Sequence, residues 1–162
     1  MNCRTLAVLG STGTIGTYTL DIVDKFPGQF RVVSLACGKN IEKLIPQIEK
    51  YQPRVVSVDQ ADLIPKLKNL FPQVDFFSGS EGILACLQIE SIDVAIVGVV
   101  GFAGLNPTIQ ALRHSKMVGL ANKESLVVAG TLLQKEISNS KAVCIPVDSE
   151  HNAVYQLLMG RE

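Results

Sequence analysis

Short runs of consecutive apolar residues, rich in valine and isoleucine, recur along the chain between longer and more polar segments. In Val94-Ala95-Ile96-Val97, apolar side chains occupy adjacent positions instead of alternating with polar ones. Such runs are typical of strands covered on both faces, as in a parallel sheet flanked by helices. The pattern predicts strands over Thr5–Leu9, Phe30–Ala36, Arg54–Val58, Val74–Phe77, Val94–Val100, Met117–Leu120 and Ala142–Val147.

The segments between these runs have helical periodicity. In Ile41–Tyr51 apolar residues recur every three or four positions, and Pro46 is expected to kink or shorten that helix. Asn106 followed by Pro107 is typical of an N-cap and first-turn pair, for a helix that ends at Ser115. The other predicted helices are Ile15–Phe26, Ala61–Leu70 with Pro65 as a weak point, a short one from Ser80 to Cys86, and Ser125–Ser138.

The alternation of strands and helices predicts βαβ units, and therefore an α/β fold with a doubly wound, mostly parallel, Rossmann-like sheet. The tail from His151 to Glu162 follows the last predicted strand and is interpreted as the first helix of a further domain. We therefore expect a nucleotide-binding domain over residues 1–147. The start of a second, catalytic domain is expected over residues 148–162, where it is truncated.

Composition narrows the class of protein. Lys+Arg and Asp+Glu both number 15 in 162 residues, so balanced charge gives no electrostatic basis for nucleic-acid or membrane-surface partners. The four cysteines are scattered without a Cys-x-x-Cys pair, which favours reduced thiols in a cytosolic protein over a disulfide framework. Neither a signal peptide nor a membrane-spanning run is recognisable. A cytoplasmic location is therefore expected.

The segment Gly10-Ser-Thr-Gly13-Thr-Ile-Gly16 directly follows the first strand and opens the first helix. Glycines there allow a tight turn and close approach of a phosphate, which the helix N-terminus then binds. The spacing is G-x-x-G-x-x-G rather than the commoner G-x-G-x-x-G, so a glycine-rich turn without a ligand is the alternative.

The end of the second strand helps to distinguish NAD from NADP. An acidic residue at this position binds the ribose 2′-hydroxyl, whereas a basic one suits a 2′-phosphate. The strand is followed by Gly38-Lys39-Asn40, without a carboxylate, which favours NADPH. The alternative is that Lys39 is a solvated surface lysine and Asn40 a helix cap.

Two further polar segments follow later strands. Asn122-Lys123-Glu124-Ser125 would lie at the carboxyl edge of the sheet, while the alternative is an ordinary capping turn with Asn122 as the helix cap. Asp148-Ser149-Glu150 follows the last strand, and residues two apart in an extended segment point the same way. The two carboxylates could thus share Mg²⁺ or Mn²⁺, while the alternative is a polar turn that starts a helix. Of the two histidines, His114 is expected to be structural, and His151 has no obvious partner.

Taken together, GSTGTIG, the strand end ACGKN, LANKESLV and PVDSEHNAV resemble the 1-deoxy-D-xylulose 5-phosphate reductoisomerase family from about Leu6 to Gln156. The resemblance implies that Lys123, Asp148 and Glu150 are catalytic, that Asp148 and Glu150 bind the metal, and that Lys123, Ser149 and Glu150 contact substrate. It implies NADPH contacts from Thr12, Gly13, Thr14, Ile15, Gly38, Lys39, Asn40, Asn122 and Glu124, with Gly38–Asn40 at the 2′-phosphate.

The implied activity is rearrangement and NADPH-dependent reduction of 1-deoxy-D-xylulose 5-phosphate to 2-C-methyl-D-erythritol 4-phosphate, in non-mevalonate isoprenoid synthesis. Mg²⁺ or Mn²⁺, a small sugar-phosphate substrate and a homodimer of the full-length enzyme are implied as well. Family members continue well beyond Glu162, so this chain alone is expected to be inactive. The alternatives are another NAD(P)-dependent Rossmann dehydrogenase and a non-catalytic dinucleotide-binding module.

Overall fold

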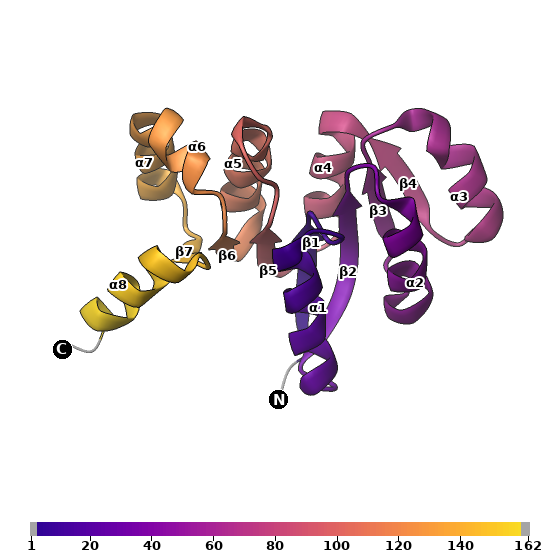
Figure 1. Ribbon diagram of the computed structural model, residues 1–162, viewed down its shortest axis with the longest axis horizontal. Coiled ribbons are helices and arrows are strands. Elements are labelled where there is room, and N and C mark those ends of the chain that lie inside the picture. The colour runs from indigo at the N-terminus through magenta and orange to yellow at the C-terminus, as the bar shows by residue number, and fades with distance from the viewer. Residues whose placement is uncertain (1–2, 160–162) are drawn as a thin grey trace.

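The computed structural model describes residues 3–159, apart from the side chains of Lys123, Ser125 and Leu126 (Figure 1). The described residues form a seven-stranded sheet in the order β4-β3-β2-β1-β5-β6-β7, and every neighbouring pair of strands is parallel. The strands are β1 (Arg4–Leu9), β2 (Phe30–Cys37), β3 (Val55–Val58), β4 (Asp75–Ser78), β5 (Ile92–Val97), β6 (Ser115–Leu120) and β7 (Val143–Pro146). The predicted doubly wound α/β fold is confirmed.

Helices connect the strands and cover both faces of the sheet (Figure 1). They are α1 (Thr14–Lys25), α2 (Ile41–Tyr51), α3 (Ile64–Leu70), α4 (Gly79–Gln88), α5 (Leu105–His114), α6 (Lys123–Val128), α7 (Gly130–Asn139) and α8 (Ser149–Met159). Short 3₁₀ helices, η1 (Ala61–Leu63) and η2 (Phe102–Gly104), precede α3 and α5. No helix within residues 3–159 is both long and apolar enough to cross a membrane.

Two apolar cores lie on opposite faces of the sheet. Leu6 and Val8 of β1 belong to the core formed with α1, α2 and α3, whereas Ala7 and Leu9 belong to the core formed with α4, α5 and α7. Alternate residues of a strand point to opposite faces, so a strand buried on both sides needs an unbroken apolar run. This arrangement explains the runs that the sequence shows.

Several helix predictions change in the structure. Helix α2 keeps its full length, so the expectation that Pro46 would shorten it is wrong; Leu44 and Ile48 anchor it in the core on either side of the proline. Asn106 is not an N-cap, because η2 feeds directly into α5 and makes Gly104 the residue before the helix. Pro107 still falls in the first turn, where its missing N–H costs no intrahelical bond.

The single helix predicted over Ser125–Ser138 is also wrong. The chain forms α6 and α7 instead, and Ala129 between them leaves helical geometry with φ −121° and ψ 28°. The side chains of Val127 and Val128 are exposed, at 83% and 66%, so burial does not hold this part of the chain in one continuous helix.

The tail forms α8, which begins at Ser149, two residues earlier than predicted, and projects from the β7 edge of the sheet (Figure 1). Several of its apolar side chains are solvent-exposed, including Val154 at 56% and Leu157 at 71%. Residues 160–162, the last part of the predicted tail helix, lie outside the described residues.

Candidate functional site

The turn between β1 and α1 lies where the sheet changes direction. Strand β1 pairs with β2 on one side and with β5 on the other, so the connections leave its carboxyl end in opposite directions. In open α/β sheets, ligands bind in the crevice that this reversal opens. The N–H groups of Gly10 and Ser11 both donate to the Ala36 carbonyl, 2.8 Å away in each case, which ties the turn to the end of β2.

Two glycines in this turn are required by the geometry. Gly10 has φ +90°, and a Cβ on it would lie 2.8 Å from the carbonyl carbon of Gly98. A Cβ on Gly16 would lie 2.3 Å from the Gly10 carbonyl oxygen. Both contacts are too close for any side chain, so the turn needs glycine at its first and last positions.

The N-terminus of α1 is open to an anion. The preceding residue, Gly13, makes no side-chain capping bond, and the first turn carries no acidic residue. The N–H of Thr17 donates to Gly13, whereas the N–H groups of Thr14, Ile15 and Gly16 have no acceptor within an α-helix. These N–H groups and the positive end of the helix can bind a phosphate.

The end of β2 contacts the glycine turn. The Thr12 hydroxyl lies 3.3 Å from the Cys37 thiol, and the Gln47 amide of α2 donates to the Ser11 carbonyl at 3.0 Å. Burial raises the pKa of Cys37, and its hydrogen bonds with the Thr12 hydroxyl and with the Asn40 carbonyl only partly oppose that effect. The Ser11 hydroxyl is fully buried and has no hydrogen-bond partner among the described residues.

Gly38, Lys39 and Asn40 follow Cys37 on the same edge. The Asn40 carboxamide accepts a hydrogen bond from the Lys43 N–H at 3.1 Å, so Asn40 caps α2 as the alternative interpretation held. Lys39 is exposed, and with Lys66 it lines a shallow depression beside α2. Residues 38–40 therefore carry a cationic side chain and no carboxylate, although Glu42 of α2 lines the same depression.

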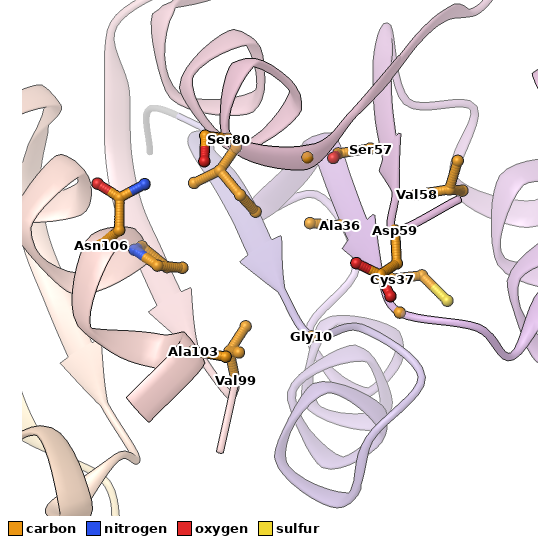
Figure 2. Close-up of a pocket in the computed structure, with 14 residues that line it drawn as sticks. Gly10, Ala36, Cys37, Ser57, Val58, Asp59, Ser80, Val99, Ala103 and Asn106 are labelled. Carbon is orange, nitrogen blue, oxygen red and sulfur yellow. The ribbon is translucent and has the colours of Figure 1, made fainter. Parts of the chain in front are cut away.

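A cavity of about 290 Å³ opens between the ends of β1, β2 and β3 and the first turns of α4 and α5 (Figure 2). Gly10, Cys37 and Gly38 line one side of it. The sequence interpretation did not assign four other polar residues that line it to a site. Two lie at the end of β3, Ser57 and Asp59, and two in the first turns of α4 and α5, Ser80 and Asn106.

Asn122 is buried and holds the loop after β5. Its amide nitrogen donates to the carbonyls of Val99 and Gly101, both at 2.7 Å. A Cβ on Gly104 would lie 1.8 Å from that nitrogen, so the loop packs directly on the amide. Since Val99 lines the cavity, Asn122 connects the end of β6 to the candidate site. Glu124 is exposed, and the Lys123 side chain lies outside the described part of the chain.

The geometry predicted for Asp148 and Glu150 is wrong in one respect. Ser149 already begins α8, so the segment is not extended and the two-residue alternation does not apply. Asp148 precedes the helix and accepts hydrogen bonds from the backbone N–H of His151 at 2.9 Å and from its ring at 2.6 Å. His151, for which the sequence suggested no partner, therefore has one. The Ser149 hydroxyl contacts the Glu150 carboxylate at 3.0 Å.

The pKa of Asp148 reflects this contact. Partial burial raises its pKa, but the hydrogen bonds from His151 outweigh burial and hold the net value below the usual range. Within residues 3–159, no group of three or more His, Cys, Asp or Glu side chains is arranged to hold a metal ion. Carboxylate oxygens suit Mg²⁺, but two of them under-fill its octahedral shell.

Comparisons with known proteins agree with this arrangement. Residues 6–130 match the family model described as 1-deoxy-D-xylulose 5-phosphate reductoisomerase. The reductoisomerase of Synechococcus sp. (strain CC9605) is 39% identical over 165 residues, which cover 97% of this chain but 40% of that protein. The chain thus spans about two fifths of the length of its curated relatives.

Solved structures give the same assignment. A DOX-P reductoisomerase in complex with NADPH, fosmidomycin and magnesium superimposes with a TM-score of 0.87 at 36% identity, covering 94% of this chain and 38% of that one. The Zymomonas mobilis reductoisomerase in complex with NADPH gives a TM-score of 0.89 at 32% identity, covering 96% and 42%. On the match to the family model, supported by these structures, the chain belongs to the 1-deoxy-D-xylulose 5-phosphate reductoisomerase family.

Proposed function

We propose that this chain is the NADPH-binding part of an enzyme that converts 1-deoxy-D-xylulose 5-phosphate to 2-C-methyl-D-erythritol 4-phosphate. Family membership supports the reaction, and related structures contain NADPH and magnesium. The observation that carries the proposal is the open N-terminus of α1 at the reversal of the sheet, beside a buried Ser11 hydroxyl that lacks a partner among the described residues. This arrangement fits a dinucleotide.

The pyrophosphate is proposed to bind the backbone over Thr12–Ile15. The absence of Cβ atoms at Gly10 and Gly16 lets the turn fold tightly enough for the helix N–H groups to point at the anion. The 2′-phosphate is proposed to lie at Gly38–Asn40, where Lys39 supplies positive charge. Since Asn40 already caps α2, its contribution there would come from the amide nitrogen or the backbone.

Asn122 and Glu124 are proposed to lie at the nicotinamide side of the cofactor. Asn122 acts there chiefly by fixing the Val99–Gly101 loop, because its amide nitrogen is already bonded to that loop. Lys123 is proposed to meet the substrate. The cofactor supplies the hydride, and the chain's own residues bind, orient and exclude water.

Asp148 and Glu150 are proposed as ligands of Mg²⁺ or Mn²⁺, and Ser149 and Glu150 as substrate contacts. Such a metal polarises carbonyl and hydroxyl oxygens when bound. In the structure, Asp148 is bonded to His151 and Glu150 lies in the first turn of α8. Further ligands from water, substrate or other residues are needed to fill the shell.

We further propose that residues 1–147 form the nucleotide domain and that residues 148–162 open the catalytic domain. Without the remaining three fifths of its relatives' length, the chain is expected to bind NADPH but not to turn over substrate. A sugar phosphate as substrate, no nucleic-acid or membrane partner, a homodimeric whole enzyme and a cytoplasmic location complete the proposal.

The proposal is tested by titrating the chain with NADPH and with NADH while following nicotinamide fluorescence, with and without Mn²⁺. We expect NADPH to bind and NADH to bind more weakly, because the 2′-phosphate adds charge-assisted contacts. If the chain binds neither NADPH nor NADH, the proposed function is wrong.

A further inference from the structure

The cavity beyond the glycine turn has a size and lining that suit one part of a dinucleotide. Its volume of about 290 Å³ is just below the roughly 300–1,000 Å³ of whole small-molecule sites, as expected for a site that holds one part of a larger ligand. It begins at Gly10, so a molecule whose phosphates lie on α1 would extend into it. The inference drawn from this cavity rests on the proposed NADPH function.

The walls of the cavity are largely apolar. Ile83 of α4 and Val99 after β5 form one side, and Val58 at the end of β3 contributes to the other. Apolar walls with a few polar groups at the rim favour a flat aromatic ring that presents its hydrogen-bonding edge to those groups. Of the two bases of NADPH, adenine matches this description and lies nearer the 2′-phosphate, because its own ribose carries that group.

Asp59 is the acidic residue among the described residues that line this cavity, and its side chain is exposed. It directly follows β3, and its backbone N–H donates to the Gly38 carbonyl at 3.4 Å, so it adjoins the proposed 2′-phosphate site. Figure 2 shows its carboxylate turned toward the space between Ala36 and Gly10. Ser80 and Asn106 line the cavity from its α4 and α5 side.

We infer that Asp59 selects adenine by accepting a hydrogen bond from its exocyclic 6-amino group. An ionised carboxylate only accepts hydrogen bonds, and the 6-amino group only donates. Hypoxanthine has a carbonyl oxygen at that position, so the same contact would set two acceptors against each other. Asp59 is thus a specificity-determining residue.

The test compares NADPH with its hypoxanthine analogue, deamino-NADPH, by fluorescence titration of the 162-residue chain. The unaltered chain should bind the analogue about tenfold more weakly, as expected for loss of a hydrogen bond to a charged group. In Asp59→Asn the ratio of the two dissociation constants should approach one, because the carboxamide can both accept and donate. Asp62→Asn, in η1, is the matched control and should keep the tenfold ratio.

Each other outcome has a defined meaning. If neither nucleotide binds the unaltered chain, the proposed function itself fails. If NADPH binds but the analogue binds equally well, or if Asp59→Asn keeps the discrimination, the role of Asp59 is overturned while the proposed function stands. Equal tightening of both nucleotides in Asp59→Asn also overturns it, since Asp59 would then act only as a repelling charge.

Discussion

The Cα of Gly16 faces the carbonyl oxygen of Gly10 so closely that a methyl group on Gly16 would lie 2.3 Å from that oxygen. This contact packs the first turn of α1 against the turn that precedes it. The turn itself is anchored to the end of β2, because the N–H groups of Gly10 and Ser11 donate to the Ala36 carbonyl.

Replacing Gly16 with alanine should therefore damage stability and binding together. We expect Gly16→Ala to lower the free energy of unfolding by about 1–3 kcal/mol through overpacking, and to weaken NADPH binding at least tenfold. Urea unfolding and fluorescence titration measure the two effects. Gly130→Ala, at the start of α7 where an added Cβ meets nothing within 4 Å, should leave both unchanged. Normal stability and binding in Gly16→Ala would contradict the packing argument.

Asn122→Ala should destabilise the protein by about 2 kcal/mol, because it removes both donors to the carbonyls of Val99 and Gly101. Asn122→Asp should be at least as harmful, since a carboxylate cannot donate to those carbonyls. Urea denaturation provides the measurement, with the exposed Asn139→Ala as control. Equal midpoints for Asn122→Ala and the unaltered protein would show that the loop does not depend on this amide.

Lys39→Gln should weaken NADPH binding about tenfold while leaving NADH binding nearly unchanged, because only NADPH carries the 2′-phosphate. The effect should diminish at high salt, as expected for an exposed charge. Lys25→Gln, at the far end of α1, removes the same positive charge but should not alter the preference for NADPH over NADH. An equal loss of affinity for both nucleotides would place Lys39 away from the 2′-phosphate.

Asp93, which lies away from the candidate site, should make the stability of the protein depend on pH. A hydrogen bond from Lys116 and one from the Thr5 backbone lower the pKa of Asp93 from 3.8 to about 2. A carboxyl group whose pKa is lowered by folding stabilises the fold at any pH above the pKa that it has in the unfolded chain. This contribution is lost as the pH falls from about 4 toward 2. Asp93→Asn should cost about 1 kcal/mol at pH 7, after solvent screening of this partly exposed pair.

The difference between Asp93→Asn and the unaltered protein should shrink below pH 4. Urea unfolding followed at pH 7, 4 and 2.5 measures it, with the exposed Asp75→Asn as a control for general charge effects. A constant difference across that range would mean that the charge on Asp93 does not contribute.

The strands and the glycine turn could be predicted from the sequence because their signals are local. An unbroken apolar run reflects burial on two faces, and Gly16 reflects a contact with Gly10 within seven residues of chain. The boundary at Asn106 could not be read in the same way. Gly101, with φ +68°, precedes η2, and η2 leads into α5 before Asn106 is reached. The preference of Asn-Pro for the start of a helix therefore does not set the boundary.

The arrangement at Asp148 and Asp59 depended on information that a sequence pattern does not carry. The sequence left open whether Asp148 continues a strand or lies in a polar turn that starts a helix. Its bonds to His151 and the start of α8 at Ser149 show that the second alternative is correct. Asp59 follows β3 as an ordinary polar residue. It becomes part of a cavity only once the order β3-β2-β1-β5 brings those strand ends together.

The pairing of β1 with β5 has a consequence for the order in which the molecule assembles. Thr5 and Asp93, which are hydrogen-bonded across this pair, are 88 positions apart. Non-local strand pairing of this kind is slow, and the glycine turn leaves the ribosome long before Gly98 can pack against it. A nucleotide that binds only the crevice between β2 and β5 therefore stabilises the folded protein. It does not stabilise the part of the sheet that is synthesised before β5.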